Sequence, residues 1–452
     1  MIIGIIGGSG LDNPETSETL VSDSVQKSDK KISGILKDYK EIEVETPYGK
    51  PSSPIASGKI SNVEVYIINR HGRKHEITPT HVNNRANIFA LAKLGCKYIL
   101  ATSAVGSLKE EIKPGDFVIA DQLIDFTKQR KTSFYDDFKE KIEHISLADP
   151  FSENLRKRLI ESCIELGYKY HKKGTTITIE GPRFSTRAES NLFRSWNADV
   201  IGMTTAPEAA LAREADVEYA VVCMSTDYDC WKQGEEDVTI EIVFERMKEN
   251  AERVKKLIIK VIENISKWDE KKKDLQIIKE SIRTIPNFPK RGIMFRDITT
   301  LMKNPDVMKK VINIFVERYK DKEIDVVAGI ESRGFIFAAI LSEKLNAKFV
   351  PVRKPGKLPA AIEREEYSLE YGKDAVEIHK DAISPGENVL LIDDLIATSG
   401  TMAAAVNLVQ RLGGNIEECA VIIELEDLEG RKKLEEKRIK LFSLVKFKES
   451  EV

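Results

Sequence analysis

The sequence predicts an α/β protein of at least two domains, and three observations carry that prediction. Short apolar runs at residues 2–6 and 389–392 continue without alternation, which is typical of buried parallel strands. Small polar or charged residues follow each run, and residues 402–412, which come after the second, have the composition of a helix. The length of 452 residues suits two or three domains.

Composition excludes several classes of protein. Hydrophobic residues make up 41% and charged residues 32% of the chain, as in folded globular proteins. A formal net charge of −3 gives no reason to expect nucleic acid or a membrane as partner. No apolar run approaches the roughly twenty residues of a spanning helix, and the first ten residues lack the basic segment of a signal peptide. Five scattered cysteines without a CxxC pair favour the cytoplasm and make a zinc site unexpected.

Three strand ends in the first half present hydroxyl and cationic groups. The first apolar run ends in a Gly-rich turn with Ser9, the second, at 63–69, precedes Arg70, and the third, at 98–101, precedes Ser103. Glycines let backbone N–H groups approach an anion, and arginine grips phosphate with two N–H groups. Because α/β sheets place ligands at strand carboxyl ends, the sequence predicts a phosphate site there.

Together with EGPRFS at 180–185, GMTTAPE at 202–208 and STDYDCW at 225–231, these strand ends resemble the trimeric purine nucleoside phosphorylase family. Within it they are most similar to the 5′-methylthioadenosine phosphorylases, and the resemblance implies an α/β domain with a mixed central sheet. The phosphate site that it implies consists of Ser9, Arg70, His71, Ser103, Ala104 and Thr204. The nucleoside would contact Phe184, Ser185 and Met203. The methylthio pocket would comprise Ile240, Val243 and Phe244, with His144 from a neighbouring subunit.

The resemblance places Asp227 and Asp229 at the purine edge as catalytic residues. A departing adenine needs a proton at N7, and general acids of this kind contribute about 10²–10⁴-fold. A carboxylate also accepts from the exocyclic amino group, which a 6-oxopurine lacks, so the pair favours a 6-aminopurine. One departure is that residues 251–266 run directly into the second half, where the family usually adds a segment that closes the pocket.

A charge cluster at 268–274 lies between two helical patterns and is the candidate linker. We therefore expect domains at 1–266 and 280–452, joined by a linker at 267–279. Charged helix formers dominate the linker, which indicates a semi-rigid connection.

Residues 389–401, VLLIDDLIATSGT, carry the strongest pattern of the second half. Asp393 and Asp394 end the strand, and a small polar loop leads into the helix. Backbone N–H groups of such a loop bind phosphate, whereas the carboxylates suit ribose hydroxyls or a phosphate-bound Mg²⁺ ion. The loop residues assigned to the anion are Ala397, Thr398, Ser399, Gly400 and Thr401.

This segment resembles the phosphoribosyl-pyrophosphate (PRPP) motif of type I phosphoribosyltransferases, and nearly all of the second half resembles adenine phosphoribosyltransferase. The resemblance implies a parallel sheet with a small hood. FPKRGIMFRDIT at 288–299 would bind adenine through the Met294 backbone and the Arg296 side chain, with Phe295 alongside. Ser399 is a departure, since close relatives usually carry glycine there.

Two basic motifs and a loop complete the expected PRPP site. The cations that would bind its pyrophosphate are Arg333 of GIESRGF and Arg353, Lys354 and Lys357 of PVRKPGKLP. YSLEYG at 367–372 resembles the mobile loop that keeps water from the reacting centre, with Glu370 as a catalytic residue and Tyr371 bound to PRPP. Mg²⁺ would arrive with PRPP, with Asp393 and Asp394 as candidate ligands. No organic cofactor is expected.

The two resemblances imply a bifunctional purine salvage enzyme. The first half would cleave 5′-methylthioadenosine with phosphate, and the second would join the released adenine to PRPP, giving AMP and diphosphate. Its partners would be these small molecules and other copies of the chain, as a hexamer or trimer, because one family forms trimers and the other dimers. Two alternatives stay open: a first half that acts on adenosine, on 6-oxopurine nucleosides or as a hydrolase, and a second half that senses PRPP or nucleotide without catalysis.

Overall fold

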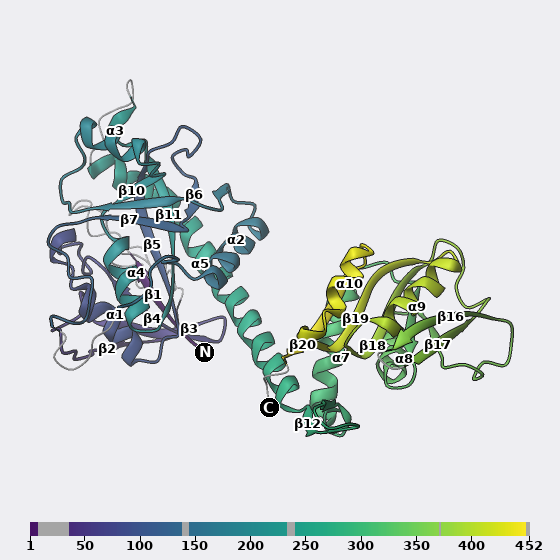
Figure 1. The fold of residues 1–452 in the computed structure, drawn as a ribbon. Coiled ribbons are helices and arrows are strands. Elements are labelled where there is room, and N and C mark those ends of the chain that lie inside the picture. Colours follow the sequence, from purple (N-terminus) through teal and green to yellow (C-terminus); the bar gives the residue numbers. More distant parts are fainter. Residues whose placement is uncertain (8–35, 138–143, 233–239, 370–371, 449–452) are drawn as a thin grey trace. The chain divides into compact units, whose positions relative to one another are not determined.

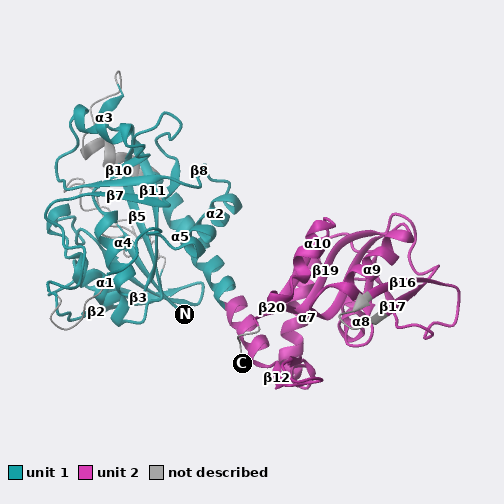
Figure 2. Cartoon of the chain, viewed as in Figure 1, with its two compact units in different colours: residues 1–269 teal, residues 270–452 magenta. Residues whose placement is uncertain are grey.

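The computed structural model describes residues 1–7, 36–137, 144–232, 240–369 and 372–448. The chain divides into two compact units, Met1–Asp269 and Glu270–Val452 (Figure 2). Each unit contains its own central sheet with helices around it (Figure 1). None of the helices in these ranges combines the length and hydropathy that a membrane crossing requires.

The first unit is built on a mixed sheet. Its described strands are β1 (Ile2–Gly7), β2 (Lys37–Ile42), β3 (Ile55–Ile60), β4 (Val63–Asn69), β5 (Tyr98–Ser107), β6 (Phe117–Ile119), β7 (Gln122–Phe126), β8 (Tyr170–His171), β9 (Thr175–Ile179), β10 (Val200–Gly202) and β11 (Glu218–Asp227). The main path runs β2-β3-β4-β1-β5-β10-β9-β7, while β11 pairs with β5 and β6, and β6 pairs with β8. Strands β4, β1, β5 and β11 are mutually parallel, whereas β3, β10 and β6 pair antiparallel. The predicted mixed sheet is confirmed.

Helices cover this sheet. The described ones are α1 (Asn84–Lys93), α2 (Glu153–Glu165), α3 (Arg187–Ser195), α4 (Thr205–Glu214), the start of α5 (Ile240–Glu280) and the short 3-10 turns η2 (Pro79–His81) and η3 (Asp229–Trp231). Side chains define several of the helix starts. Ser152 accepts a hydrogen bond from Leu155 N at the start of α2, and Thr186 and Glu189 form a capping box at the start of α3.

The parallel strands bring their carboxyl ends to one edge of the sheet. Gly7 of β1 lies opposite Asn69 of β4, and Gly106 of β5 lies opposite Asp227 of β11. The four strands are apolar along most of their length, so they are covered by helices on both faces. Polar side chains that follow these strands therefore gather at that edge.

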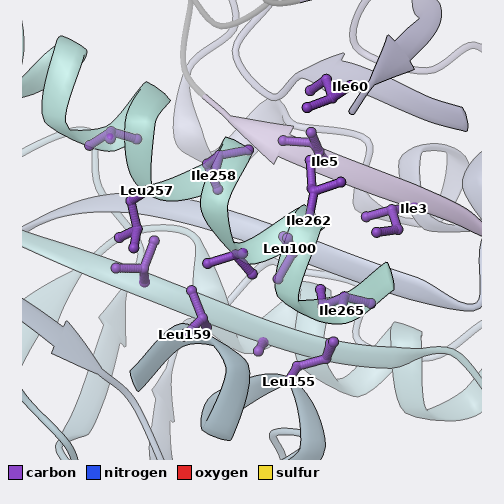
Figure 3. Packing of buried hydrophobic residues seen from close by; sticks show 14 of the residues in the cluster. Ile3, Ile5, Ile60, Leu100, Leu155, Leu159, Leu257, Ile258, Ile262 and Ile265 are labelled. Atoms are coloured by element: carbon purple, nitrogen blue, oxygen red, sulfur yellow. The ribbon is translucent and has the colours of Figure 1, made fainter. Parts of the chain in front are cut away.

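The core below this edge joins the sheet to α2 and α5. In Figure 3, Leu257, Ile258 and Ile262 of α5 lie against side chains of β1 and β5. Leu155 and Leu159 extend the same cluster from α2. The apolar face of α5 thus anchors the helix to the sheet, and each of these side chains is essentially inaccessible to solvent.

The range 267–279, which the sequence analysis assigned to a linker, is helical throughout and belongs to α5. The boundary between the two units falls inside it, after Asp269. Ile265 belongs to a core cluster of the first unit, and Ile278 to one of the second. The charge cluster therefore lies on a continuous helix that contributes apolar residues to each unit.

The second unit has a parallel sheet. Its described elements are β12 (Arg283–Pro286), β13 (Met294–Asp297), α6 (Thr299–Met302), α7 (Pro305–Tyr319), β14 (Val326–Ile330), α8 (Gly334–Lys344), β15 (Lys348–Val352), β16 (Ile362–Leu369), β17 (Gly372–His379), β18 (Asn388–Ile396), α9 (Gly400–Arg411), β19 (Asn415–Leu425), η4 (Glu426–Leu428), α10 (Gly430–Glu436) and β20 (Leu441–Phe447). The sheet order is β15-β14-β18-β19-β20, and every pairing is parallel, as predicted. Two small antiparallel sheets, β12-β13 and β16-β17, stand apart from it.

Replacing Ile262 by alanine should destabilise the first unit by about 2–5 kcal/mol, because the side chain is fully buried and its removal leaves a cavity. The free energy of unfolding from denaturant titration measures this loss. Ile164→Ala is the matched control, since Ile164 of α2 is 60% exposed and should cost well under about 1 kcal/mol. Equal losses in the two variants would contradict the described packing of α5.

Candidate active sites

Arg70 lies at the carboxyl edge of the first sheet, directly after β4, and it is buried. Its backbone N–H donates to Gly7 O at 3.0 Å, which joins the ends of β4 and β1. Its guanidinium donates to one carboxylate oxygen of Glu208 through Nε and to the other through Nη2 at 3.1 Å. Nη1 donates to Thr102 O at 3.0 Å. Sequence reasoning did not identify Glu208, although the residue ends the GMTTAPE motif.

His71 is held as a neutral ring. Its Nδ1 lies 2.9 Å from Ile77 O, and because a carbonyl oxygen only accepts, Nδ1 carries the proton. Burial and the neighbouring charge of Arg70 lower the pKa of His71 to about 4. The ring also lies 4.6 Å from the ring of His75, centroid to centroid. At neutral pH, Nε2 of His71 is therefore an acceptor, suited to the O–H of a hydrogen phosphate ion.

Two hydroxyl groups meet at the same edge. Ser103 Oγ of β5 lies 3.1 Å from Thr204 Oγ1, and Ala104 follows Ser103 in the strand. Thr204 directly precedes α4, and its side chain forms no capping hydrogen bond with that helix. The structure thus brings together hydroxyls that are about a hundred residues apart in sequence. The predicted phosphate residue Ser9 lies outside the described residues.

Asp227 ends β11, Asp229 begins the turn η3, and the two form one acidic pair. Asp227 accepts from Thr226 Oγ1 and from the backbone N–H of Asp229, both at 2.7 Å. Burial raises the pKa of Asp227, and burial together with the charge of Asp227 raises the pKa of Asp229 to about 6. A Cβ at Gly106 would lie 2.9 Å from Asp227 Oδ1, so only glycine leaves room for this carboxylate. A carboxyl group that holds a proton near neutral pH suits general-acid catalysis.

The predicted nucleoside residues lie next to this pair. Cys230 Sγ lies 3.2 Å from Ser185 O, which ties the Ser185 segment to the residue after Asp229. Phe184 is 36% exposed, so its ring is available at the surface. Met203 O accepts from Arg130 Nη1 at 3.1 Å. Arg130 was not predicted, because only the fold shows that it reaches the Met203 segment.

Four other predictions concern the 5′ end of the nucleoside. His144 is exposed in the single chain, so its predicted approach from a neighbouring subunit stays a prediction. Ile240, Val243 and Phe244 belong to α5, but their side chains lie outside the described part of the structure.

In the second unit, three predicted groups come together. Arg333 Nη2 lies 2.9 Å from Asp394 Oδ2, and the Arg333 guanidinium lies 5.6 Å from the centre of the Phe295 ring. The Phe288 ring meets the Phe295 ring edge-on at 5.1 Å. The expected base segment, the expected pyrophosphate arginine and the acidic pair therefore share one place, even though they lie far apart in sequence.

Arg296, which is predicted to bind adenine, lies inside the second unit. Its side chain is 3% exposed, its Nη1 donates to Thr284 Oγ1, and its guanidinium lies 4.4 Å from the centre of the Phe447 ring. Stacking on an aromatic ring and a hydroxyl partner keep the charge inside the unit. Adenine contact by this side chain stays a prediction, and the neighbouring residues Met294 and Phe295 are more exposed.

The basic segment after β15 is organised by acidic side chains that the sequence analysis did not assign. Glu331 accepts from Arg353 Nε at 3.2 Å and from the Lys354 backbone N–H at 2.9 Å. The Lys354 ammonium pairs with Asp374, and Arg353 Nη1 donates to Lys357 O at 3.2 Å. The three predicted cations thus lie in one segment, with acidic partners for two of them. Glu370 and Tyr371 lie outside the described residues.

Asp393 and Asp394 stand at the carboxyl end of β18. Asp393 Oδ1 accepts from the Asp394 backbone N–H at 2.8 Å. Burial and the neighbouring Asp394 hold the pKa of Asp393 well above its usual range, and burial raises the pKa of Asp394, against the effect of Arg333. Adjacent carboxylates are oxygen donors of the kind that Mg²⁺ prefers, so the residues present fit a Mg²⁺–PRPP complex. Within the described residues, no cluster of three or more His, Cys, Asp or Glu side chains could hold a metal by itself.

The loop between β18 and α9 is shaped by two backbone constraints. Ser399 has φ of 66°, in the left-handed region that favours glycine, which is the residue that the family resemblance leads one to expect here. A Cβ at Gly430 of α10 would lie 2.2 Å from Ala397 O, so α10 packs directly on the loop. Lys433 Nζ also donates to Thr398 O at 3.2 Å. Sequence reasoning missed Gly430 and Lys433 because no local motif marks them.

The folds and sites of the two units define a pentosyltransferase. Residues 3–263 match the phosphorylase superfamily, and residues 297–452 match the phosphoribosyl transferase domain. The chain belongs to the phosphorylase superfamily and carries a phosphoribosyltransferase domain in its second half. The predicted fusion of a nucleoside phosphorylase with a phosphoribosyltransferase is confirmed.

Relatives and solved structures match the first unit. The S-methyl-5'-thioadenosine phosphorylase of Xenopus tropicalis is 47% identical over 292 residues, 64% of this chain and 97% of that protein. That of Danio rerio is 48% identical over 270 residues, 59% of this chain and 90% of its own length. The structure of methylthioadenosine phosphorylase from Schistosoma mansoni in complex with adenine has 36% identity and a TM-score of 0.51, covering 59% of this chain and 92% of its own. A methylthioadenosine phosphorylase from an antarctic soil metagenomic library has 40% identity and a TM-score of 0.52, covering 59% and 86%.

Asp229→Asn should stabilise the first unit more at pH 7.5 than at pH 4.5. Burial raises the pKa of Asp229 in the folded protein to about 6. The neutral Asp229 carboxyl therefore contributes its full stabilisation below about pH 4, and this contribution is lost as the pH rises through 6. Asparagine stays neutral, so the gain approaches at most about 3 kcal/mol above pH 7.

Unfolding free energies at the two pH values measure this gain. Asp216→Asn is the matched control, since Asp216 has a similar left-handed φ of 54° but is exposed. It should change stability equally at both pH values. A pH-independent effect of Asp229→Asn would show that this carboxyl is not strained by burial.

Gly430→Ala should reduce phosphoribosyl transfer by more than about 10-fold, since the new methyl group displaces the Ala397 carbonyl and with it the anion loop. Diphosphate release measures the change, and nucleoside phosphorolysis should be unaffected. Lys433→Ala, which removes a contact to the same loop without a clash, should have a much smaller effect. Unchanged transfer by Gly430→Ala would contradict the role of α10 in shaping the loop.

Proposed function

We propose that the first unit cleaves 5′-methylthioadenosine with phosphate, giving adenine and 5-methylthioribose 1-phosphate. The second unit then joins adenine to PRPP and releases AMP and diphosphate. The observation that carries the proposal is the buried acidic pair Asp227–Asp229 at the end of β11. Its raised pKa values suit protonation of a departing purine, and relatives named for methylthioadenosine match the same unit.

In the first reaction, Asp227 would hold the purine at N7 and at the 6-amino group. A protonated carboxyl donates to N7 as the bond between N9 and C1′ breaks, and its other oxygen accepts from the amino group. Asp229, hydrogen-bonded to Asp227 through its backbone, would keep that carboxyl in place. A 6-oxopurine presents an acceptor at the same position, so this arrangement supports a 6-aminopurine.

Phosphate, bound at the carboxyl edge of the sheet, would approach the face of the ribose that is opposite the departing purine. Arg70 supplies charge, while the Ser103 and Thr204 hydroxyls and the helix that follows Thr204 supply donors. Bound phosphate oxygens would stabilise the positive charge that develops on the ribose ring. His71, with Nε2 as an acceptor, would bind the remaining phosphate O–H.

In the second reaction, Phe295 would lie against adenine and Arg333 against the diphosphate. The Asp393–Asp394 pair would bind the ribose hydroxyls and Mg²⁺, which supplies charge neutralisation for the leaving diphosphate. Arg333 already pairs with Asp394, so PRPP would exchange one anionic partner of this arginine for another. One described segment contains Arg353, Lys354 and Lys357, and this grouping of cations supports a polyanion site.

Adenosine is the second candidate substrate of the first unit. A related structure is named as an adenosine/methylthioadenosine phosphorylase from Schistosoma mansoni, with 35% identity to this chain. An apolar pocket at the 5′ position would favour the thioether over a hydroxyl group, which would lose its hydrogen-bond partners there.

The proposal is tested by assaying the two reactions separately in the full chain. Wild-type protein should release adenine from 5′-methylthioadenosine only with phosphate, and should form AMP from adenine, PRPP and Mg²⁺. The double variant Asp393→Asn with Asp394→Asn should lose AMP formation and keep adenine release. Asp227→Asn should show the reverse pattern. Phosphate-independent adenine release, or no AMP from wild-type protein, would overturn the corresponding half of the proposal.

A further inference from the structure

Glu208 is a buried charge that no predicted site includes. It lies in the first turn of α4 and is fully inaccessible to solvent. Its carboxylate accepts from Arg70 Nε, from Arg70 Nη2 at 3.1 Å and from Tyr219 Oη at 2.8 Å. A carboxylate that is shielded from water requires such partners, because burying an unpaired charge costs roughly several kcal/mol. Arg70 supplies the positive charge that this position needs.

The pairing fixes the direction of the guanidinium. Arginine has five N–H groups in one plane. Glu208 takes the N–H of Nε and one of Nη2, while Thr102 O takes one of Nη1. Among the described residues, this leaves one N–H on each terminal nitrogen for another acceptor. Arg70 Nη1 donates to Thr102 O, and Thr102 precedes Ser103, whose hydroxyl meets that of Thr204. The guanidinium therefore lies next to the strand segment that carries one of these hydroxyls.

We propose that Glu208 is a positioning residue for phosphate, which fixes the Arg70 guanidinium so that its two remaining N–H groups meet the anion. This inference rests on the proposed function, because it assumes that Arg70 binds the phosphate of the first reaction. The carboxylate acts through Arg70 and touches no reacting atom. We therefore expect the Glu208–Arg70 pair to affect binding of the anion and to leave binding of the nucleoside unchanged.

A similar cluster in the second unit provides a control. Glu418 of β19 accepts from Arg318 Nε and Nη2 and from Tyr319 Oη, each at 2.7 Å, and is 3% exposed. The Arg318 guanidinium lies 4.0 Å from the centre of the Phe442 ring, and its described side-chain partners, Glu418, Tyr319 and Phe442, include no predicted site residue. The same three residue types thus perform a structural role there, and Glu418→Gln reports the cost of breaking such a cluster.

Glu208→Gln tests the proposal in the full chain. An amide cannot accept from both nitrogens of Arg70, so the guanidinium loses its fixed direction. We expect kcat/KM for phosphate to fall about 10–100-fold at saturating 5′-methylthioadenosine, since a displacement of about 1 Å costs this much. KM for the nucleoside and the affinity for adenine should change less than about 3-fold. Glu418→Gln should leave all these constants unchanged.

If Glu208→Gln does not fold, Glu208→Asp keeps the charge, and its shorter side chain should raise KM for phosphate while KM for the nucleoside stays constant. Equal losses for phosphate and nucleoside, or unchanged use of phosphate, would overturn the positioning role. Arg70→Gln distinguishes a failure of the proposed phosphate contact from a failure of the Glu208 positioning role. If this variant also uses phosphate normally, the assumed phosphate contact of Arg70 fails. If only the Glu208 variants behave as wild type, the further inference fails and the proposed function stands.

Discussion

Parallel apolar strands that are covered on both faces constrain both units in the same way. Such a sheet favours charged side chains at the strand ends, and parallel strands bring their carboxyl ends to one edge. Arg70 joins Gly7 at that edge in the first unit, and β11 ends in Asp227 toward the same edge, because β1, β4, β5 and β11 share one direction. Asp394 and Arg333 meet in the second because β14 and β18 do.

Partial burial at these edges then decides the electrostatics. Each unit keeps two acidic side chains next to one another, Asp227 with Asp229 and Asp393 with Asp394, and burial raises the pKa of all four. In the second unit, Arg333 counteracts the effect for Asp394. Asp227 accepts hydrogen bonds from the Thr226 hydroxyl and from the Asp229 backbone N–H. The two pairs thus differ in their neighbours: a guanidinium lies beside the second pair, and the first accepts from a hydroxyl group and a backbone N–H.

The sequence predicts much of the fold because the decisive signals are local. Uninterrupted apolar runs identify the parallel strands, although β5 continues to Ser107 and β18 to Ile396, beyond the apolar runs that mark them. Ser399 is an example: the position where the family resemblance leads one to expect glycine has φ of 66°, in the left-handed region. The confirmed mixed and parallel sheets follow from the same patterns and from the family resemblances that they support.

Contacts between distant residues could not be predicted in this way. Glu208 lies 138 residues from Arg70, and no local pattern links an acidic residue of one helix to an arginine of one strand end. Gly430 is constrained by the Ala397 carbonyl, and the Arg296 side chain by the Phe447 ring, so both depend on packing that only the folded chain defines. The charge cluster at 268–274 gives no sign that α5 continues through it, and the boundary between the two units falls inside this helix.

The central claim is that the purine released by the first unit is the base used by the second. Its most direct test supplies 5′-methylthioadenosine labelled in the purine ring, with phosphate, PRPP and Mg²⁺, and follows the label over time. The account predicts that the label passes through free adenine into AMP, and that omission of phosphate stops both steps. Labelled adenine that accumulates without the formation of labelled AMP would contradict the account.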